Sequence, residues 1–108
     1  MLRRKQPMLV SKEIQEIRKK IFDFEKRIEE MHFDFQKYCQ GLDPRMPDYE
    51  TLEKELVFFS RRKIFDLVLS KQLDRILYKF QNRKRIWLRW AEDFQHPAPD
   101  KEQAPKSP

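Results

Sequence analysis

Apolar residues recur at helical spacing in the first half of the chain. Between Ile14 and Tyr38, large apolar residues alternate at intervals of three and four positions: Ile14, Ile17, Ile21, Phe24, Ile28, Met31, Phe35 and Tyr38. An unbroken pattern of this length is typical of a helix that packs lengthwise against other helices. Ser11 is a suitable N-cap, and Gly41 is a suitable residue to end the helix. The pattern therefore predicts a helix over residues 11–40.

A second apolar stripe follows a turn. Pro44 and Pro47 predict a turn over residues 41–47, after which Asp48 can cap a new helix. No glycine or proline occurs between Asp48 and His96, so we favour one helix over residues 48–94 that can bend near Ser60–Lys63. Two helices separated at that point are the alternative. The residues of this segment expected at helix interfaces are Phe58, Phe65, Leu69, Leu73, Ile76, Phe80 and Trp87.

The two stripes and the single glycine in 108 residues predict an all-α protein, an antiparallel helical hairpin that resembles a coiled coil. Around residues 56–69 the second stripe is apolar on almost every side, and one partner helix cannot cover such a helix. We therefore expect the hairpin to be completed by oligomerisation, as a homodimeric four-helix bundle or as part of a larger helical assembly. A monomeric hairpin or three-helix bundle is the alternative.

The ends of the chain are expected to lie outside this helical domain. Residues 1–10 carry three cations and no acid, and we expect them to form a flexible basic arm. Residues 11–95 are expected to form the single helical domain. Residues 96–108 contain four prolines and no bulky apolar residue, which predicts a disordered tail.

The positive charge of the chain is concentrated in the second predicted helix. The net charge of the whole chain is +6, whereas residues 61–90 contain ten Lys or Arg and two Asp, a net charge of +8. The cations that lie opposite or beside the apolar stripe are Arg61, Lys71, Arg75, Lys79, Arg83, Lys84, Arg85 and Arg89. Such a row is compatible with a solvated surface, with nucleic-acid binding, and with docking on an acidic protein or an anionic membrane. For nucleic acid, Tyr78, Trp87 or Trp90 would stack on bases, although the tryptophan spacing favours the helix core.

Residues suited to catalysis or metal binding are few. The only histidines, His32 and His96, and the only cysteine, Cys39, do not form a metal-ligand pattern. We expect His32 to be a solvated flanking residue and Cys39 to be an unreactive, half-buried thiol. We therefore expect no enzymatic activity, no metal or cofactor and no small-molecule substrate.

The sequence also bears on the compartment. A single cysteine suits a reducing environment, and no apolar run approaches the ~20 residues of a membrane span. We expect a cytoplasmic protein; the short basic opening, which ends at Pro7, permits mitochondrial targeting as the alternative.

These features favour a non-catalytic adaptor or scaffold. Its apolar seam would bind helices of protein partners, including a second copy of itself, and its basic face over residues 61–89 would dock on an acidic partner. A small nucleic-acid-binding protein that uses the same face is the alternative, and peripheral contact with an anionic membrane is a further one.

Overall fold

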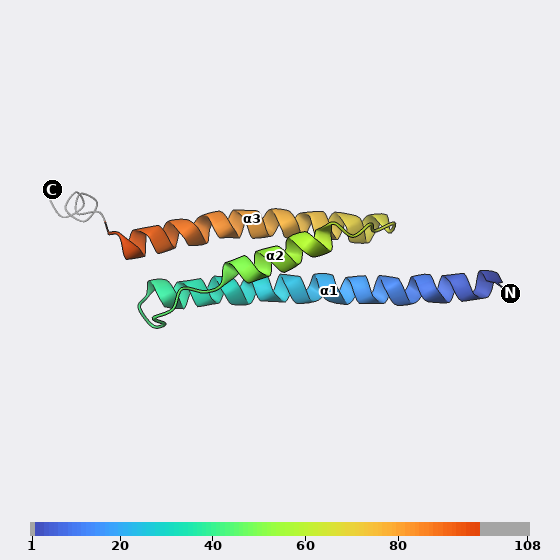
Figure 1. Cartoon of the computed structure of the whole chain (residues 1–108), viewed down its shortest axis with the longest axis horizontal. Coiled ribbons are helices and arrows are strands. Elements are labelled where there is room, and N and C mark those ends of the chain that lie inside the picture. Colours follow the sequence, from blue (N-terminus) through green and yellow to red (C-terminus); the bar gives the residue numbers. More distant parts are fainter. Residues whose placement is uncertain (1, 98–108) are drawn as a thin grey trace.

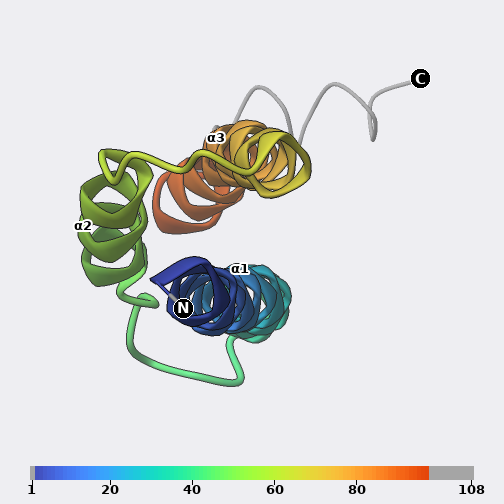
Figure 2. The same ribbon diagram turned by 90° about the vertical axis from the view of Figure 1, so that its right-hand side faces the viewer.

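Residues 2–97 form a bundle of three helices of unequal length. The computed structural model describes residues 2–97, with side chains described from residue 12 onward. The helices are α1 (Leu2–Cys39), α2 (Tyr49–Ser60) and α3 (Leu67–Gln95), and residues 2–97 contain no strand. The molecule is a rod of 77 × 25 × 18 Å, and the helices occupy the corners of a triangle when it is seen end-on (Figures 1 and 2). The predicted all-α class is confirmed. No helix in the described part of the chain combines the length and the apolar character that a membrane span requires.

Local signals in the sequence account for most helix ends. The carboxylate of Asp48 accepts hydrogen bonds from the backbone N–H of Thr51 at 3.1 Å and from its hydroxyl at 2.5 Å, which caps α2. After α1, Gly41 has φ +79° and its N–H donates to the carbonyl of Tyr38, while the N–H of Leu42 donates to that of Lys37. This is a Schellman ending, and it confirms the predicted role of Gly41.

The prediction of one long helix over residues 48–94 is wrong. The chain leaves the helix after Ser60 and re-enters it at Leu67, so the alternative with two helices is the observed one. Asp66 caps α3 by accepting from the N–H of Leu69 at 3.0 Å, and this bond competes with continuation of the helix. The break also allows α2 to turn Leu52 and Leu56 into the core, where both are buried.

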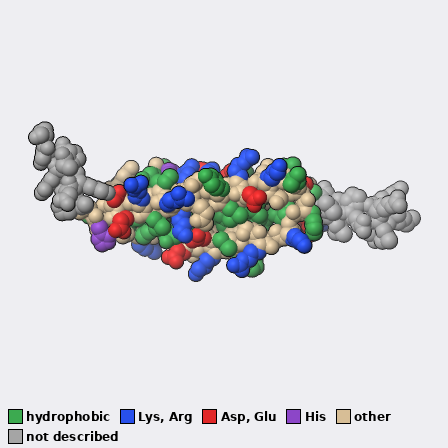
Figure 3. Space-filling model, turned by 90° about the horizontal axis from the view of Figure 1, so that it is seen from above, with side chains coloured by type: hydrophobic (Ala, Val, Ile, Leu, Met, Phe, Trp, Pro, Cys, Tyr) green, Lys and Arg blue, Asp and Glu red, His purple; other side chains and the backbone are tan. Residues whose placement is uncertain are grey.

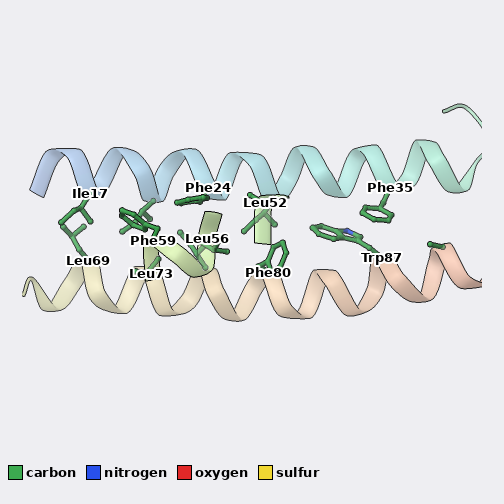
Figure 4. Packing of buried hydrophobic residues seen from close by; sticks show 14 of the residues in the cluster. Ile17, Phe24, Phe35, Leu52, Leu56, Phe59, Leu69, Leu73, Phe80 and Trp87 are labelled. Atoms are coloured by element: carbon green, nitrogen blue, oxygen red, sulfur yellow. The ribbon is translucent and has the colours of Figure 1, made fainter. Parts of the chain in front are cut away.

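The antiparallel hairpin also needs correction, because α1 and α3 run in the same direction. In Figure 1, α1 and α3 both run from right to left, and α2 runs in the opposite direction; Figure 2 shows α2 to one side of this pair. A helix of 12 residues spans about 18 Å, so α3 starts beside the first packed turns of α1. Leu69 thus faces Ile17, and Trp87 faces Phe35 (Figure 4). Oligomerisation remains a prediction.

The core combines one apolar stripe from each helix. The predicted interface residues that are buried are Ile17, Ile21, Phe24, Ile28, Phe35, Tyr38, Leu69, Leu73, Ile76, Phe80 and Trp87; Ile14 and Met31 pack against them while partly exposed. The two exceptions are Phe58 and Phe65, which are 78% and 89% exposed. The prediction placed these two in the stripe because it assumed a continuous helix. In the separate α2, Phe59 faces the core instead.

The chain is helical from Leu2 onward, where a flexible basic arm over residues 1–10 was predicted. The helix α1 begins at Leu2, so Ser11 lies inside it and is not its N-cap. Once packing from Ile14 onward has nucleated the helix, each further residue that becomes helical adds one backbone hydrogen bond. This accounts for a helix that starts before Ser11. Of the predicted tail, residues 98–108 lie outside the described residues.

Candidate functional site

The predicted basic face is divided between internal ion pairs and an exposed row. Lys79 and Arg83 of α3 contact the carboxylate of Glu29 on α1 at 2.5 and 3.3 Å. Lys84 contacts Glu53 of α2 at 2.8 Å, and its ammonium lies 5.8 Å from the ring of Tyr49. Three of the eight predicted cations therefore connect α3 to the other two helices.

The remaining cations of α3 lie on its outer face. Lys71, Arg75, Arg85 and Arg89 are exposed, and Tyr78 lies among them with 71% of its surface accessible. These residues and the half-buried Asn82 follow one another at intervals of four and three residues, which places them on one side of the helix. We call these six residues the outer basic row; it extends for about 27 Å along the helix.

The surface over α3 has a mixed character. Seen from above, Figure 3 shows Lys and Arg side chains along the rod with hydrophobic side chains between them. Arg61 is also exposed, but it lies in the linker between α2 and α3 and does not continue the outer basic row. The predicted face is therefore shorter than residues 61–89.

Arg83 occupies a position that the core pattern would give to an apolar residue. From Ile17 and Leu69 to Phe35 and Trp87, the buried residues of α1 and α3 correspond at a constant difference of 52 positions. On this register Arg83 corresponds to Met31. Its Nη2 pairs with Glu29, whereas its Nη1 is buried without a hydrogen-bond partner. A polar residue at such a position favours one register over others at a cost in stability.

The tryptophans belong to the core rather than to a binding surface. Trp87 is fully buried and stacks on Phe35 with ring centroids 5.1 Å apart and planes 6° apart. Its indole N–H donates to Nδ1 of His32 at 3.0 Å. Trp90 is half-buried, and its ring centroid lies 5.2 Å from that of His32. Of the three aromatic residues considered for base stacking, Tyr78 alone is exposed.

His32 is half-buried rather than solvated as expected, since its ring contacts the rings of both tryptophans. Burial, followed by the charge of Arg83, lowers the pKa of His32, and the charge of Glu29 opposes this shift. The hydrogen bond from Lys79, followed by the charges of Arg83 and Lys79, lowers the pKa of Glu29 despite partial burial. Burial raises the pKa of the Cys39 thiol, which is half-buried as expected.

Shallow grooves follow the sides of the bundle. Two are lined by α1 and α3 alone: one of about 350 Å³ beside Phe22 and Arg75, and one of about 460 Å³ beside Trp90 and Phe94. A third, of about 570 Å³, lies between α1 and the end of α2. Among the residues that the structure describes, no three His, Cys, Asp or Glu side chains come together as a metal site would require.

Fold and surface together define a small three-helix bundle with a basic row on the outside of its third helix. No protein-family model, curated protein or solved structure matches the chain significantly.

Proposed function

We propose that the protein is a non-catalytic helical adaptor whose outer basic row docks on an acidic protein segment. The observation that supports this most directly is the division of the cations on α3. Lys79, Arg83 and Lys84 have acidic neighbours on α1 and α2. Lys71, Arg75, Arg85 and Arg89, in contrast, are exposed, and Arg75 also lines the groove beside Phe22. Exposed charges of one sign on one side of a helix attract a partner of the opposite sign and accelerate its association.

The apolar half of the proposed adaptor is the surface between α1 and α3. The grooves beside Phe22 and beside Trp90 are lined by these two helices only. Phe22 is 64% exposed and Ile86 is 41% exposed. A fourth helix in this position would cover both grooves and produce the four-helix arrangement that is common for such bundles. A second copy of the chain, or a component of a larger helical assembly, would supply it.

Nucleic-acid binding is the second candidate, and Tyr78 is the observation that favours it. The ring is exposed in the middle of the outer basic row, with Arg75 and Asn82 on its two sides. Single-stranded nucleic acid is bound by this combination of cations for the phosphates and an aromatic ring on which a base stacks.

Charge reversal separates these proposals from a surface that is merely solvated. Fluorescence anisotropy is measured with a labelled Glu-rich peptide and with a labelled single strand of DNA. The test variant carries Lys71→Glu, Arg75→Glu and Arg85→Glu. The control carries Lys12→Glu, Lys19→Glu and Lys26→Glu, which change the net charge equally at exposed positions of α1.

The adaptor predicts peptide binding that the test variant loses and the control retains. Salt-dependent DNA binding that Tyr78→Ala weakens by about tenfold favours the nucleic-acid candidate. Equal loss in the test and control variants, or no binding to either probe, contradicts both. Light scattering reports self-association, which substitution of Phe22 by Ser would weaken.

A further inference from the structure

The two most exposed large apolar side chains of the described chain lie around the linker between α2 and α3. Phe65 in the linker is 89% exposed, and Phe58 near the end of α2 is 78% exposed. Leu67 and Val68, in the first turn of α3, are 67% and 65% exposed. Exposed apolar residues are ordinary when single, whereas clusters of them are typical of surfaces that contact an apolar phase or a partner.

This linker is held in place on its inner side. Ile64 packs against the core, and Asp66 caps α3 through its bond to the N–H of Leu69. The exposed Phe65 lies between these two anchoring residues, so the backbone that carries it is fixed at both sides. The exposed aromatic rings therefore belong to an ordered segment.

Three consecutive cations accompany the apolar side chains. Arg61, Arg62 and Lys63 are all exposed. The one acid of the linker, Asp66, is half-buried and accepts the capping bond. The combination of large apolar side chains and adjacent Lys or Arg is the composition that binds the interface of an anionic bilayer, because the former enter the acyl boundary while the latter contact lipid phosphates.

The adjoining groove has the same two components. It has a volume of about 570 Å³, and its lining combines the aromatic rings of Phe24, Phe58 and Phe59 with the cationic side chains of Lys20, Arg61 and Arg62 and with Glu55. The carboxylate of Glu55 is bound by both terminal nitrogens of Arg27 at 3.0 Å. The groove thus offers aromatic surface for part of an acyl chain and cations for a phosphate.

The shape of this region favours a membrane over a protein partner. A specific protein interface buries about 800 Å² on each side, and it needs a surface that matches its partner. Here the apolar residues project from a linker and from two helix ends on a rod whose shorter extents are only 25 and 18 Å. A deformable lipid interface accommodates such projecting side chains without a matching surface.

From these observations we propose that the linker region is a membrane-contact site that inserts Phe58, Phe65, Leu67 and Val68 into the interface of an anionic bilayer. Arg61, Arg62 and Lys63 would bind lipid phosphates beside them. The site shares no residue with the outer basic row, so it goes beyond the proposed adaptor function, and either proposal can fail without the other.

The test is co-sedimentation with vesicles of phosphatidylcholine alone or with about 30% phosphatidylserine. We expect the full chain to bind the anionic vesicles and to bind the neutral ones far more weakly. Phe58→Ser and Phe65→Ser should each lower the partition coefficient by about tenfold. Replacement of Arg61, Arg62 and Lys63 by Gln together should lower it by about a hundredfold.

Controls distinguish this site from general adhesion. Phe33→Ser, at a ring on α1 that is 57% exposed, should leave the partition coefficient within about twofold, and circular dichroism should show that each variant remains helical. Absence of binding to anionic vesicles would overturn the proposal, as would an equal loss with Phe33→Ser. A dimer in light scattering that Phe58→Ser and Phe65→Ser dissociate, without vesicle binding, would instead identify a second copy as the occupant. Reversal of Lys71, Arg75 and Arg85 tests the adaptor separately.

Discussion

The hydrogen bond between Trp87 and His32 should make the stability of the bundle depend on pH. The indole N–H of Trp87 donates to Nδ1 of His32 at 3.0 Å, so Nδ1 has to be unprotonated. Burial and the nearby guanidinium of Arg83 lower the pKa of His32 below its ordinary value of 6.5, with Glu29 acting in the opposite direction. The folded protein therefore prefers the neutral imidazole.

The sign and size of the effect follow from proton linkage. In the unfolded chain His32 takes up a proton near pH 6.5, whereas in the folded chain it does so only at a lower pH. The free energy of unfolding is thus highest above pH 6.5 and falls as the pH decreases from there. One pH unit below the unfolded pKa corresponds to about 1.4 kcal/mol, so the loss by about pH 5.5 is at most that amount. The full cost of leaving the buried indole N–H unpaired is about 1–3 kcal/mol.

Urea unfolding followed by far-ultraviolet circular dichroism, at about pH 7.5 and pH 5.5, measures this loss. The carboxylates of Glu29, Asp48 and Glu55 also have lowered pKa values, but their pairs are lost only below about pH 4.5. His32→Gln should remove the pH dependence, because the amide oxygen accepts from Trp87 at both pH values. His96→Gln, at the exposed second histidine, should retain it. The reasoning would be refuted if the free energy of unfolding of His32→Gln fell as much between the two pH values as that of the original chain, or if that of the original chain did not fall.

Three further substitutions test the helix ends and the core. Arg83→Met removes the buried Nη1 that has no partner and should raise the free energy of unfolding by about 1 kcal/mol; a loss in urea unfolding would contradict this. Gly41→Ala should lower it by about 1 kcal/mol because φ is +79°, and Gly41→Asn should lower it less in the same assay. Asp66→Ala should cost about 0.5–2 kcal/mol through loss of the cap on α3, whereas Asp66→Asn, which keeps an acceptor, should cost little in thermal unfolding.

The parts of the fold that depend on one helix at a time could be predicted. The apolar spacing from Ile14 to Tyr38 identifies the buried side of α1, and the spacing from Leu69 to Trp87 does the same for α3. The break after Ser60 could not be decided, because no glycine or proline marks it and Asp66 is the only capping signal. The direction of α3 depends on that break, so the parallel arrangement could not be predicted either.

The candidate site shows the same division. Helical geometry alone places Lys71, Arg75 and Arg89 on the side opposite the core. Helical geometry does not predict that Lys79 and Lys84 pair with acidic residues of other helices. Those pairs depend on the register between helices that are far apart in sequence. The exposure of Phe58 and Phe65 was missed for a related reason, since both were assigned to a helix face that does not exist.

The shared direction of α1 and α3 has an electrical consequence. The peptide dipoles of two long parallel helices add, and the shorter α2 opposes only part of the sum. The positive end of α1 lies at Leu2, and that of α3 lies at Leu67, where the negative end of α2 offsets part of it; the negative ends of α1 and α3 lie together at the other end of the rod. The helix dipoles of α1 and α3 and the cations of the α2–α3 linker thus polarise the rod in the same sense, so that a negatively charged surface would attract the end of the rod that carries this linker.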